Sequence, residues 1–236
     1  MTTLNLISGP RNISTALMYS FAQRNDIQVE DEPFYALYLS KSGAQHPGRD
    51  EVLASQSPDE ATVKAQLASA GKPVLFVKNM AHHMEVMQAP FIEKAIHIFL
   101  IRDPKQIIAS YAQVIENPVM RDIGIEYQYQ LFQQLEKKGE QPIVLDSGLL
   151  LEDPASVLEK LCHRCAIGFQ PAMLHWKAGA KPYDGVWAPY WYENVHQSTG
   201  FKKQQTSDRP LPQHLGPLYQ QARGYYEKLL PFSIKA

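Results

Sequence analysis

Short apolar runs alternate along this chain with longer stretches that have helical periodicity. The runs are bounded by turn residues, which is typical of strands that are buried on both faces of a sheet. The stretches between them repeat apolar positions with the 3.6-residue period of amphipathic helices. This alternation predicts the α/β fold class, with a three-layer arrangement in which helices flank both faces of a parallel sheet.

The pattern predicts individual elements as far as residue 166. Five strands are expected, at Leu4–Ser8, Ile27–Glu30, Val74–Lys78, Ile96–Ile101 and Ile143–Asp146. Helices are expected at Ser14–Arg24, Phe34–Ser40, Asp59–Ala70, Pro104–Ile115, Gly124–Lys138 and Asp153–Ala166. The stretch 182–212 is rich in aromatic residues, Pro, Gly and Lys and has little periodicity. We predict a long ordered loop there, a kind of segment that often carries function.

Composition narrows the classes of function. With 236 residues and 44% hydrophobic content, the chain can bury one substantial core, so we expect a single domain over 1–236. The net charge of −1 provides no overall attraction to nucleic acid or to an anionic membrane. The first residues run directly into a predicted strand, so we expect no charged leader, and no apolar run approaches the roughly 20 residues that span a bilayer. We therefore expect a cytoplasmic protein without nucleic-acid or membrane partners.

The two cysteines, Cys162 and Cys165, form a CxxC pair in a helical pattern. They lie late in the predicted helix, whereas a thiol is activated at a helix start. A zinc site would require further paired ligands. We interpret both cysteines as packing residues.

The segment after the first predicted strand has the features of a phosphate-binding turn. In open parallel sheets, ligands bind beyond the carboxyl ends of the strands. There the chain reads Gly9-Pro10-Arg11-Asn12-Ile13-Ser14-Thr15 and enters an amphipathic helix. The helix N-terminus offers unpaired N–H groups, Arg11 adds a charge, and Ser14 and Thr15 add hydroxyl donors. The alternative is an ordinary turn in which Ser14 caps the helix.

A second candidate anion site follows the fourth predicted strand. Arg102 directly follows that strand, and Ser110 lies about two turns (~9 Å) into the helix that comes next. Both side chains can then meet one phosphate group. The alternative is that Arg102 pairs with Asp103 or another carboxylate and that Ser110 is an ordinary helical serine. Two anion sites on neighbouring strand ends predict a ligand with two separate phosphoryl groups, as in a 3′,5′-bisphosphorylated nucleotide.

These two segments resemble the cofactor-binding motifs of the sulfotransferases. The turn at residues 10–15 resembles the loop for the 5′-phosphosulfate, with Ile13 where that family usually has glycine, and Arg102 and Ser110 resemble the 3′-phosphate motif at the same spacing. A bacterial-type subfamily is similar also at Asp31-Glu32-Pro33, Lys78-Asn79-Met80-Ala81-His82-His83 and Trp187-Ala188-Pro189-Tyr190-Trp191-Tyr192. Relatives of this subfamily can carry aminotransferase-like names, but the sequence has no aminotransferase pattern.

The resemblance implies a fold, a cofactor and a reaction. The fold would be the P-loop NTPase-like sulfotransferase fold. The cofactor would be 3′-phosphoadenosine-5′-phosphosulfate (PAPS), and its product adenosine 3′,5′-bisphosphate (PAP), with no metal required. The reaction would move a sulfuryl group to a hydroxyl or amine of a small-molecule acceptor. The residues implied in cofactor binding are Gly9, Pro10, Arg11, Asn12, Ile13, Ser14, Thr15, Arg102 and Ser110.

The sequence leaves the catalytic base open among His82, His83 and Glu32. Arg11, helped by Ser14, Thr15 and Lys78, would stabilise the leaving oxygen. The two histidines are slightly preferred as bases because imidazole titrates near neutral pH. Glu32 is the rival because some bacterial carbohydrate sulfotransferases use a glutamate from that region. The plain alternatives are capping or backbone hydrogen bonds for the histidines and an N-terminal helix charge for Glu32.

Two further classes of function stay open at this point. One is a small-molecule kinase on the same fold that uses ATP and magnesium, although the turn after the first strand lacks the Gly-Lys-Ser/Thr ending of a Walker A loop. The other is a non-catalytic sensor of PAP. The aromatic residues of 183–203 are expected to line the acceptor or adenine pocket, or to pack on the core. This stretch lies where sulfotransferases usually have a Gly- and Lys-containing loop over the cofactor.

Overall fold

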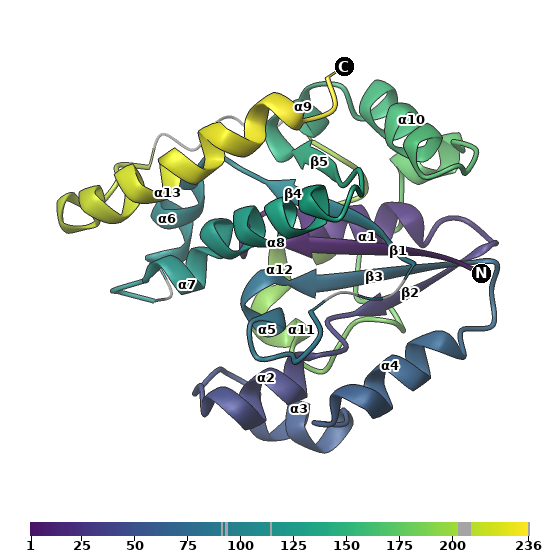
Figure 1. The fold of residues 1–236 in the computed structure, drawn as a ribbon, viewed down its shortest axis with the longest axis horizontal. Helices are drawn as coiled ribbons and strands as arrows, with labels where there is room; N and C mark the ends of the chain where they lie inside the picture. Colours follow the sequence, from purple (N-terminus) through teal and green to yellow (C-terminus); the bar gives the residue numbers. More distant parts are fainter. Residues whose placement is uncertain (91, 93, 114, 203–208, 236) are drawn as a thin grey trace. The chain divides into compact units, whose positions relative to one another are not determined.

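Five strands form one sheet in the computed structural model, which describes residues 1–236 except 91, 93, 114, 203–208 and 236. They are β1 (Thr2–Ser8), β2 (Ile27–Asp31), β3 (Val74–Met80), β4 (Ile96–Ile101) and β5 (Ile143–Asp146). Their order is β2-β3-β1-β4-β5 (Figure 1). β2 pairs with β3, and β4 with β5, in parallel register. The predicted parallel α/β fold and its five strands are confirmed.

The helices alternate with the strands as predicted. They are α1 (Ser14–Phe21), α2 (Tyr35–Ser42), α3 (Arg49–Ser55), α4 (Glu60–Ala68), α5 (Ala81–Met84), α6 (Pro104–Tyr111), α7 (Met120–Ile123), α8 (Ile125–Lys137), α9 (Ser147–Glu152), α10 (Pro154–Arg164), α11 (Ala188–Trp191), α12 (Glu193–His196) and α13 (Gly216–Leu229). Asp59 and Asp153, predicted as helical residues, are N-caps that accept hydrogen bonds from Thr62 N and Ser156 N. Among the described residues, no helix has both the length and the apolar character needed to cross a membrane.

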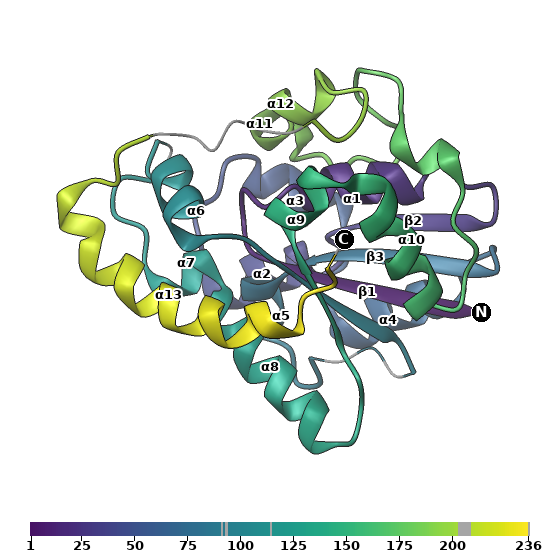
Figure 2. The same ribbon diagram turned by 90° about the horizontal axis from the view of Figure 1, so that it is seen from above.

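The prediction of an irregular stretch at 182–212 is wrong in part. Within it the chain forms the two short helices α11 and α12, which lie next to each other (Figure 2). Residues 203–208, including Lys203 of the predicted cofactor loop, lie outside the described residues. Helix α13 was not predicted, because Gly224 interrupts its middle and only Ala222 and Leu229 are buried. It forms because it packs on α6 and α8.

The chain folds into two compact units, each built from separate stretches. Unit 1 comprises Met1–Leu6, Thr15–Ile96 and Gln170–Phe201. Unit 2 comprises Ile7–Ser14, His97–Phe169 and Lys202–Ala236. The single domain expected over 1–236 stays a prediction.

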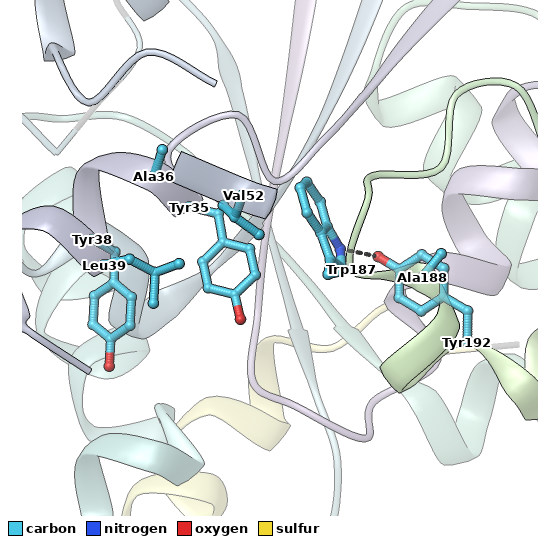
Figure 3. Packing of buried hydrophobic residues seen from close by; sticks show 8 residues of the cluster. All are labelled: Tyr35, Ala36, Tyr38, Leu39, Val52, Trp187, Ala188 and Tyr192. Carbon is cyan, nitrogen blue, oxygen red and sulfur yellow. Dashed lines mark hydrogen bonds between the residues drawn. The ribbon is translucent and has the colours of Figure 1, made fainter. Parts of the chain in front are cut away.

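The aromatic residues that follow residue 182 contribute to the core of unit 1. Trp187 and Tyr192 are buried with α2 residues, and the Trp187 Nε1–H donates to the Tyr192 hydroxyl at 3.1 Å (Figure 3). Tyr190, on the same segment, is exposed. The cluster comprises Tyr35, Ala36, Tyr38, Leu39, Val52, Trp187, Ala188 and Tyr192. Packing on the core, one of the two expected roles of this segment, therefore applies to Trp187 and Tyr192.

The two cysteines lie in the core of unit 2. Cys162 and Cys165 are buried, and no disulfide joins them. Burial raises the pKa of the Cys165 thiol to about 12, so this thiol stays protonated at neutral pH. A buried protonated thiol is a poor nucleophile, as expected of a packing residue.

Gly9 permits a close backbone approach in unit 2. A Cβ at this position would lie 2.4 Å from the carbonyl oxygen of Ile123, at the end of α7. With its amide oriented to match both neighbours, Gln128 accepts from the Gly9 N–H at 3.0 Å and donates to the Leu100 carbonyl at 3.2 Å. Gly9 is therefore required by packing, and its N–H is already engaged.

We predict that Gly9→Ala lowers the free energy of unfolding by about 1–3 kcal/mol, because the added methyl group meets backbone that has little room to move. Urea denaturation measures this change. Gly71→Ala is the matched control, since a Cβ at Gly71 would meet nothing within 4 Å. Equal losses in the two variants would contradict the packing account.

Candidate functional site

The turn between β1 and α1 has a strained backbone that suits an anion. Arg11 and Ile13 have positive φ values of 55° and 49°, which non-glycine residues rarely adopt. Left-handed residues separated by a residue of negative φ direct backbone N–H groups toward one point, the geometry of an anion-binding nest. Ile13 is β-branched and stands where glycine would be unstrained. Strain of this kind persists where the surroundings impose it, most often at functional sites.

Two side chains of unit 2 hold this turn. The Asn12 Nδ2–H donates to the carbonyl oxygen of Leu100 at 2.6 Å, and Asn12 is 2% exposed. The Arg102 Nη1–H donates to the carbonyl oxygen of Arg11 at 2.8 Å. Both contacts come from β4 or the residue after it, so β4 fixes the conformation of the turn after β1.

Arg11, Arg102 and Ser110 lie together in unit 2. The Arg11 Nε–H donates to the Ser110 hydroxyl at 3.0 Å, and the Arg102 Nε–H donates to Gln106 Oε1 at 2.9 Å. The two predicted anion sites are thus in direct contact through Arg11 and Ser110. In the part of the chain that the structure describes, Arg11 has no ion pair with a carboxylate within 4.0 Å.

The electrostatics of these arginines indicate an excess of positive charge. Burial and then the charge of Arg209 lower the pKa of the Arg11 guanidinium. Burial also lowers the pKa of Arg102, with Asp146 opposing this effect and Arg11 adding to it. Arg209 is a residue that sequence reasoning missed, because the stretch around it has no periodicity. A basic residue beside Pro210 in a predicted functional loop was the available signal.

A buried ionic cluster lies at the ends of β2 and β3 in unit 1. Asp31 and Lys78 are register partners on these strands. The Lys78 ammonium donates to Asp31 Oδ1 at 2.8 Å, to Glu32 Oε1 and to the Tyr192 hydroxyl at 2.7 Å. Lys78 is 1% exposed, and these three contacts use all three of its N–H groups. We call Asp31, Glu32, Lys78 and Tyr192 the ionic cluster.

The two carboxylates of the ionic cluster have different surroundings. Asp31 accepts from Lys78, from the Tyr192 hydroxyl at 2.8 Å and from the Gly185 N–H at 3.2 Å. Glu32 also accepts from the Lys78 ammonium, through Oε1. Its Oε2 lies 3.7 Å from His83 Nδ1. Burial raises the pKa of Glu32, the Asp31 charge raises it further, and Lys78 opposes both. Glu32 also has a positive φ of 44°, held by a hydrogen bond from its N–H to the Lys78 carbonyl at 2.8 Å.

His82 and His83 lie on α5, in the same unit as Glu32. The His83 ring stacks on Tyr35 and Tyr38, with centroid distances of 4.3 and 4.8 Å. Burial, together with the neighbouring His82, His46 and Lys78, lowers the pKa of His83 well below its ordinary value. His83 is therefore a neutral and weakly basic imidazole at neutral pH. The His82 ring meets Tyr38 edge-on at 5.0 Å.

Two buried carboxylates anchor residues 183–196, which we call the aromatic segment. Asp31 holds it through Tyr192 and Gly185, as described above. Asp184 accepts from the Tyr19 hydroxyl at 2.7 Å and lies 3.0 Å from His196 Nε2. These anchors were not predicted, because they join positions 165 and 161 residues apart without a local motif.

The remaining predicted residues divide between the two units. Ser14 begins α1 in unit 2, whereas Thr15 belongs to unit 1 and its hydroxyl hydrogen-bonds to that of Tyr192. Pro10 lies in the turn itself. In the described part of the chain, no group of three or more His, Cys, Asp or Glu side chains is arranged to hold a metal ion.

Comparison with known proteins assigns the family. A family model of the sulfotransferase domain matches residues 2–230. Two Arabidopsis thaliana proteins, branched-chain-amino-acid aminotransferase-like proteins 1 and 2, are similar in sequence. The first is 39% identical over 87% of this chain, and the second is 36% identical over 90% of it. The chain spans only 37% and 38% of the lengths of these two relatives.

Three solved structures share the fold. The sulfotransferase domain of the Synechococcus PCC 7002 olefin synthase has a TM-score of 0.61 and 18% identity, over 96% of this chain and 94% of that one. The sulfotransferase domain of the curacin biosynthetic pathway has a TM-score of 0.57 and 13% identity, over 100% and 99%. A sulfotransferase from Alicyclobacillus acidocaldarius has a TM-score of 0.58 and 12% identity, over 99% and 98%. At such low identities the likeness concerns the fold.

Proposed function

The chain belongs to the sulfotransferase family, and from this membership we propose that it transfers a sulfuryl group from PAPS to a hydroxyl or amine of a small-molecule acceptor. The observation that carries the proposal is the state of Arg11 in the strained turn. It is a partly buried cation with other arginines beside it and no carboxylate ion pair among the described residues. Buried charges are normally paired, so an anionic ligand is the natural partner of this site.

We assign the two phosphate-bearing ends of the donor to different residues of unit 2. Arg11 and the backbone N–H groups of Asn12–Ser14 bind the 5′ end, where the nest and the N-terminus of α1 favour negative charge. Arg102 and Ser110 bind the 3′-phosphate. The hydrogen bond between Arg11 and Ser110 is then replaced by bonds to the ligand. Arg209 supplies a further charge, because its field reaches Arg11.

In the proposed reaction, an acceptor oxygen or nitrogen attacks sulfur while the bond from sulfur to the bridging phosphate oxygen breaks. Negative charge develops on that oxygen as PAP leaves, and Arg11 with the N-terminus of α1 stabilises it. The acceptor loses its proton to the catalytic base. The chemistry balances without a metal or a redox partner.

Glu32 is the base that we favour. Burial and Asp31 make its carboxylate more basic than an ordinary glutamate, while Lys78 keeps enough positive charge nearby for it to ionise. His83 is less basic than an ordinary histidine. Its ring also packs between Tyr35 and Tyr38, which restricts the approach of an acceptor. His82 is the alternative base, and Lys78 acts as the counter-ion of the carboxylates.

Adenosine 3′,5′-bisphosphate should raise the thermal unfolding temperature without added metal, and more than AMP or ATP does at equal concentration. A ligand that binds only the native state stabilises it, and only PAP can use both phosphate sites. Thermal shift assays with and without magnesium measure this effect. Equal shifts with the three nucleotides, or a shift that requires ATP and magnesium, would reject the donor assignment and favour the kinase alternative.

Arg102→Ala should reduce the preference for PAP over AMP about 10- to 100-fold, because a charge-assisted hydrogen bond contributes roughly 1.5–3 kcal/mol. Titration calorimetry with both nucleotides measures the ratio. Arg223→Ala is the matched control, since this exposed arginine of unit 2 pairs with Glu227 at 2.7 Å. An unchanged ratio in Arg102→Ala would show that Arg102 only supports the turn.

Glu32→Gln should lower turnover about 10²- to 10⁴-fold with little change in PAP affinity, as expected for loss of a general base. In the wild type, turnover should fall as the pH drops through the raised pKa of Glu32, above the range of an ordinary glutamate. Release of PAP in the presence of a panel of hydroxyl and amine acceptors provides the assay. Glu30→Gln, on the preceding strand β2, is the control.

The variants His82→Ala and His83→Ala should retain most activity. If one of them loses activity while Glu32→Gln stays active, that histidine is the base.

A further inference from the structure

Asp31 and Glu32 are adjacent carboxylates with one ammonium between them. Lys78 donates to both, so its single positive charge cannot neutralise the two together. Asp31 binds three donors, from Lys78, Tyr192 and Gly185. Glu32 Oε1 accepts from Lys78 and, at 3.4 Å, from the Tyr192 hydroxyl, while its Oε2 faces His83 Nδ1 at 3.7 Å. Asp31 is thus the more fully hydrogen-bonded of the two carboxylates, which leaves Glu32 as the one suited to exchange a proton.

We propose that Asp31 is a positioning residue for Glu32: it holds Lys78 and Tyr192 in place and shares the Lys78 charge, so that Glu32 remains the proton-exchanging carboxylate of the cluster. This inference rests on the proposed role of Glu32 as base. Asp31 itself does not touch the acceptor in this account. It acts through Lys78, through Tyr192 and through its own charge.

The groups that face Glu32 come from four places in unit 1. Asp31 precedes it at the end of β2, and Lys78, the register partner of Asp31, lies on β3. Tyr192 follows α11, and its buried phenol is neutral because burial and the two carboxylates raise its pKa. His83 on α5 is neutral near pH 7, since burial lowers its pKa. Lys78 and Asp31 are therefore the charged side chains that decide how readily Glu32 ionises.

Opposite substitutions in this pair should shift the titration of Glu32 in opposite directions. Asp31→Asn removes a negative charge and leaves the Lys78 ammonium to Glu32 alone, which stabilises ionised Glu32. Its titration should move to lower pH by about one pH unit. Lys78→Met removes the only positive charge of the cluster, so the titration should move to higher pH.

Asp184→Asn is the matched control for a structural effect. Asp184 also anchors the aromatic segment, through Tyr19 and His196, but Lys78, Asp31 and Tyr192 are the side chains that influence the pKa of Glu32 most. The Asp184→Asn substitution should weaken the attachment of the segment and so lower the melting temperature of the protein. The titration of Glu32 should stay where it is in the wild type.

Carbon-13 NMR of protein labelled at the glutamate carboxyl groups measures the titration directly, with Glu32→Gln identifying the signal. The same shifts should appear in the acid limb of the pH–turnover profile. A double variant, Asp31→Asn with Lys78→Met, removes both charges and suits the test if Asp31→Asn alone does not fold, because buried pairs are often replaced together without loss of folding. Its titration should lie below that of Lys78→Met.

The inference is overturned if Asp31→Asn leaves the Glu32 signal unmoved, or if Asp184→Asn moves it equally. A different result would contradict the proposed role of Glu32 as base: the NMR titrations shift as expected, but Glu32→Gln keeps normal turnover. In that case Asp31 sets the charge state of Glu32, and the base is elsewhere.

Discussion

The buried ammonium of Lys78 is the interaction on which unit 1 depends. A lysine that is 1% exposed must be paired, and here it joins carboxylates at the end of β2 to the hydroxyl of Tyr192. Breaking one side of such a network typically costs about 3–5 kcal/mol, because an unpaired charge stays buried. The cluster therefore both connects the sheet to the aromatic segment and creates an unusual carboxylate at Glu32. One arrangement serves stability and chemistry together.

Backbone strain marks both parts of the proposed mechanism. Arg11 and Ile13 are left-handed in the turn after β1, and Glu32 is left-handed after β2. None of them is glycine, so each conformation is imposed by its surroundings, through Asn12 and Arg102 in unit 2 and through the Lys78 carbonyl in unit 1. In both units the strain lies directly after a strand, where ligands bind in open parallel sheets.

Much of the fold could be predicted from the sequence because β3, β4 and β5 contain nearly continuous apolar runs. The helix α13 could not, since its interior Gly224 and few buried residues leave little periodic signal. For the site, a motif predicted Arg11, Arg102 and Ser110, and they do come together. Motifs did not predict the charge of Arg209 or the division of labour between Asp31 and Glu32. These depend on side chains brought together by folding. The preference for the histidines came from the ordinary pKa of imidazole, which burial lowers at His83.

The most direct test of the account follows the sulfuryl group itself. Protein incubated with ³⁵S-labelled PAPS and a panel of hydroxyl and amine acceptors, without metal, should move label to an acceptor and release an equal amount of PAP. The account would be contradicted if no acceptor gained label while the same acceptors were phosphorylated from ATP in the presence of magnesium.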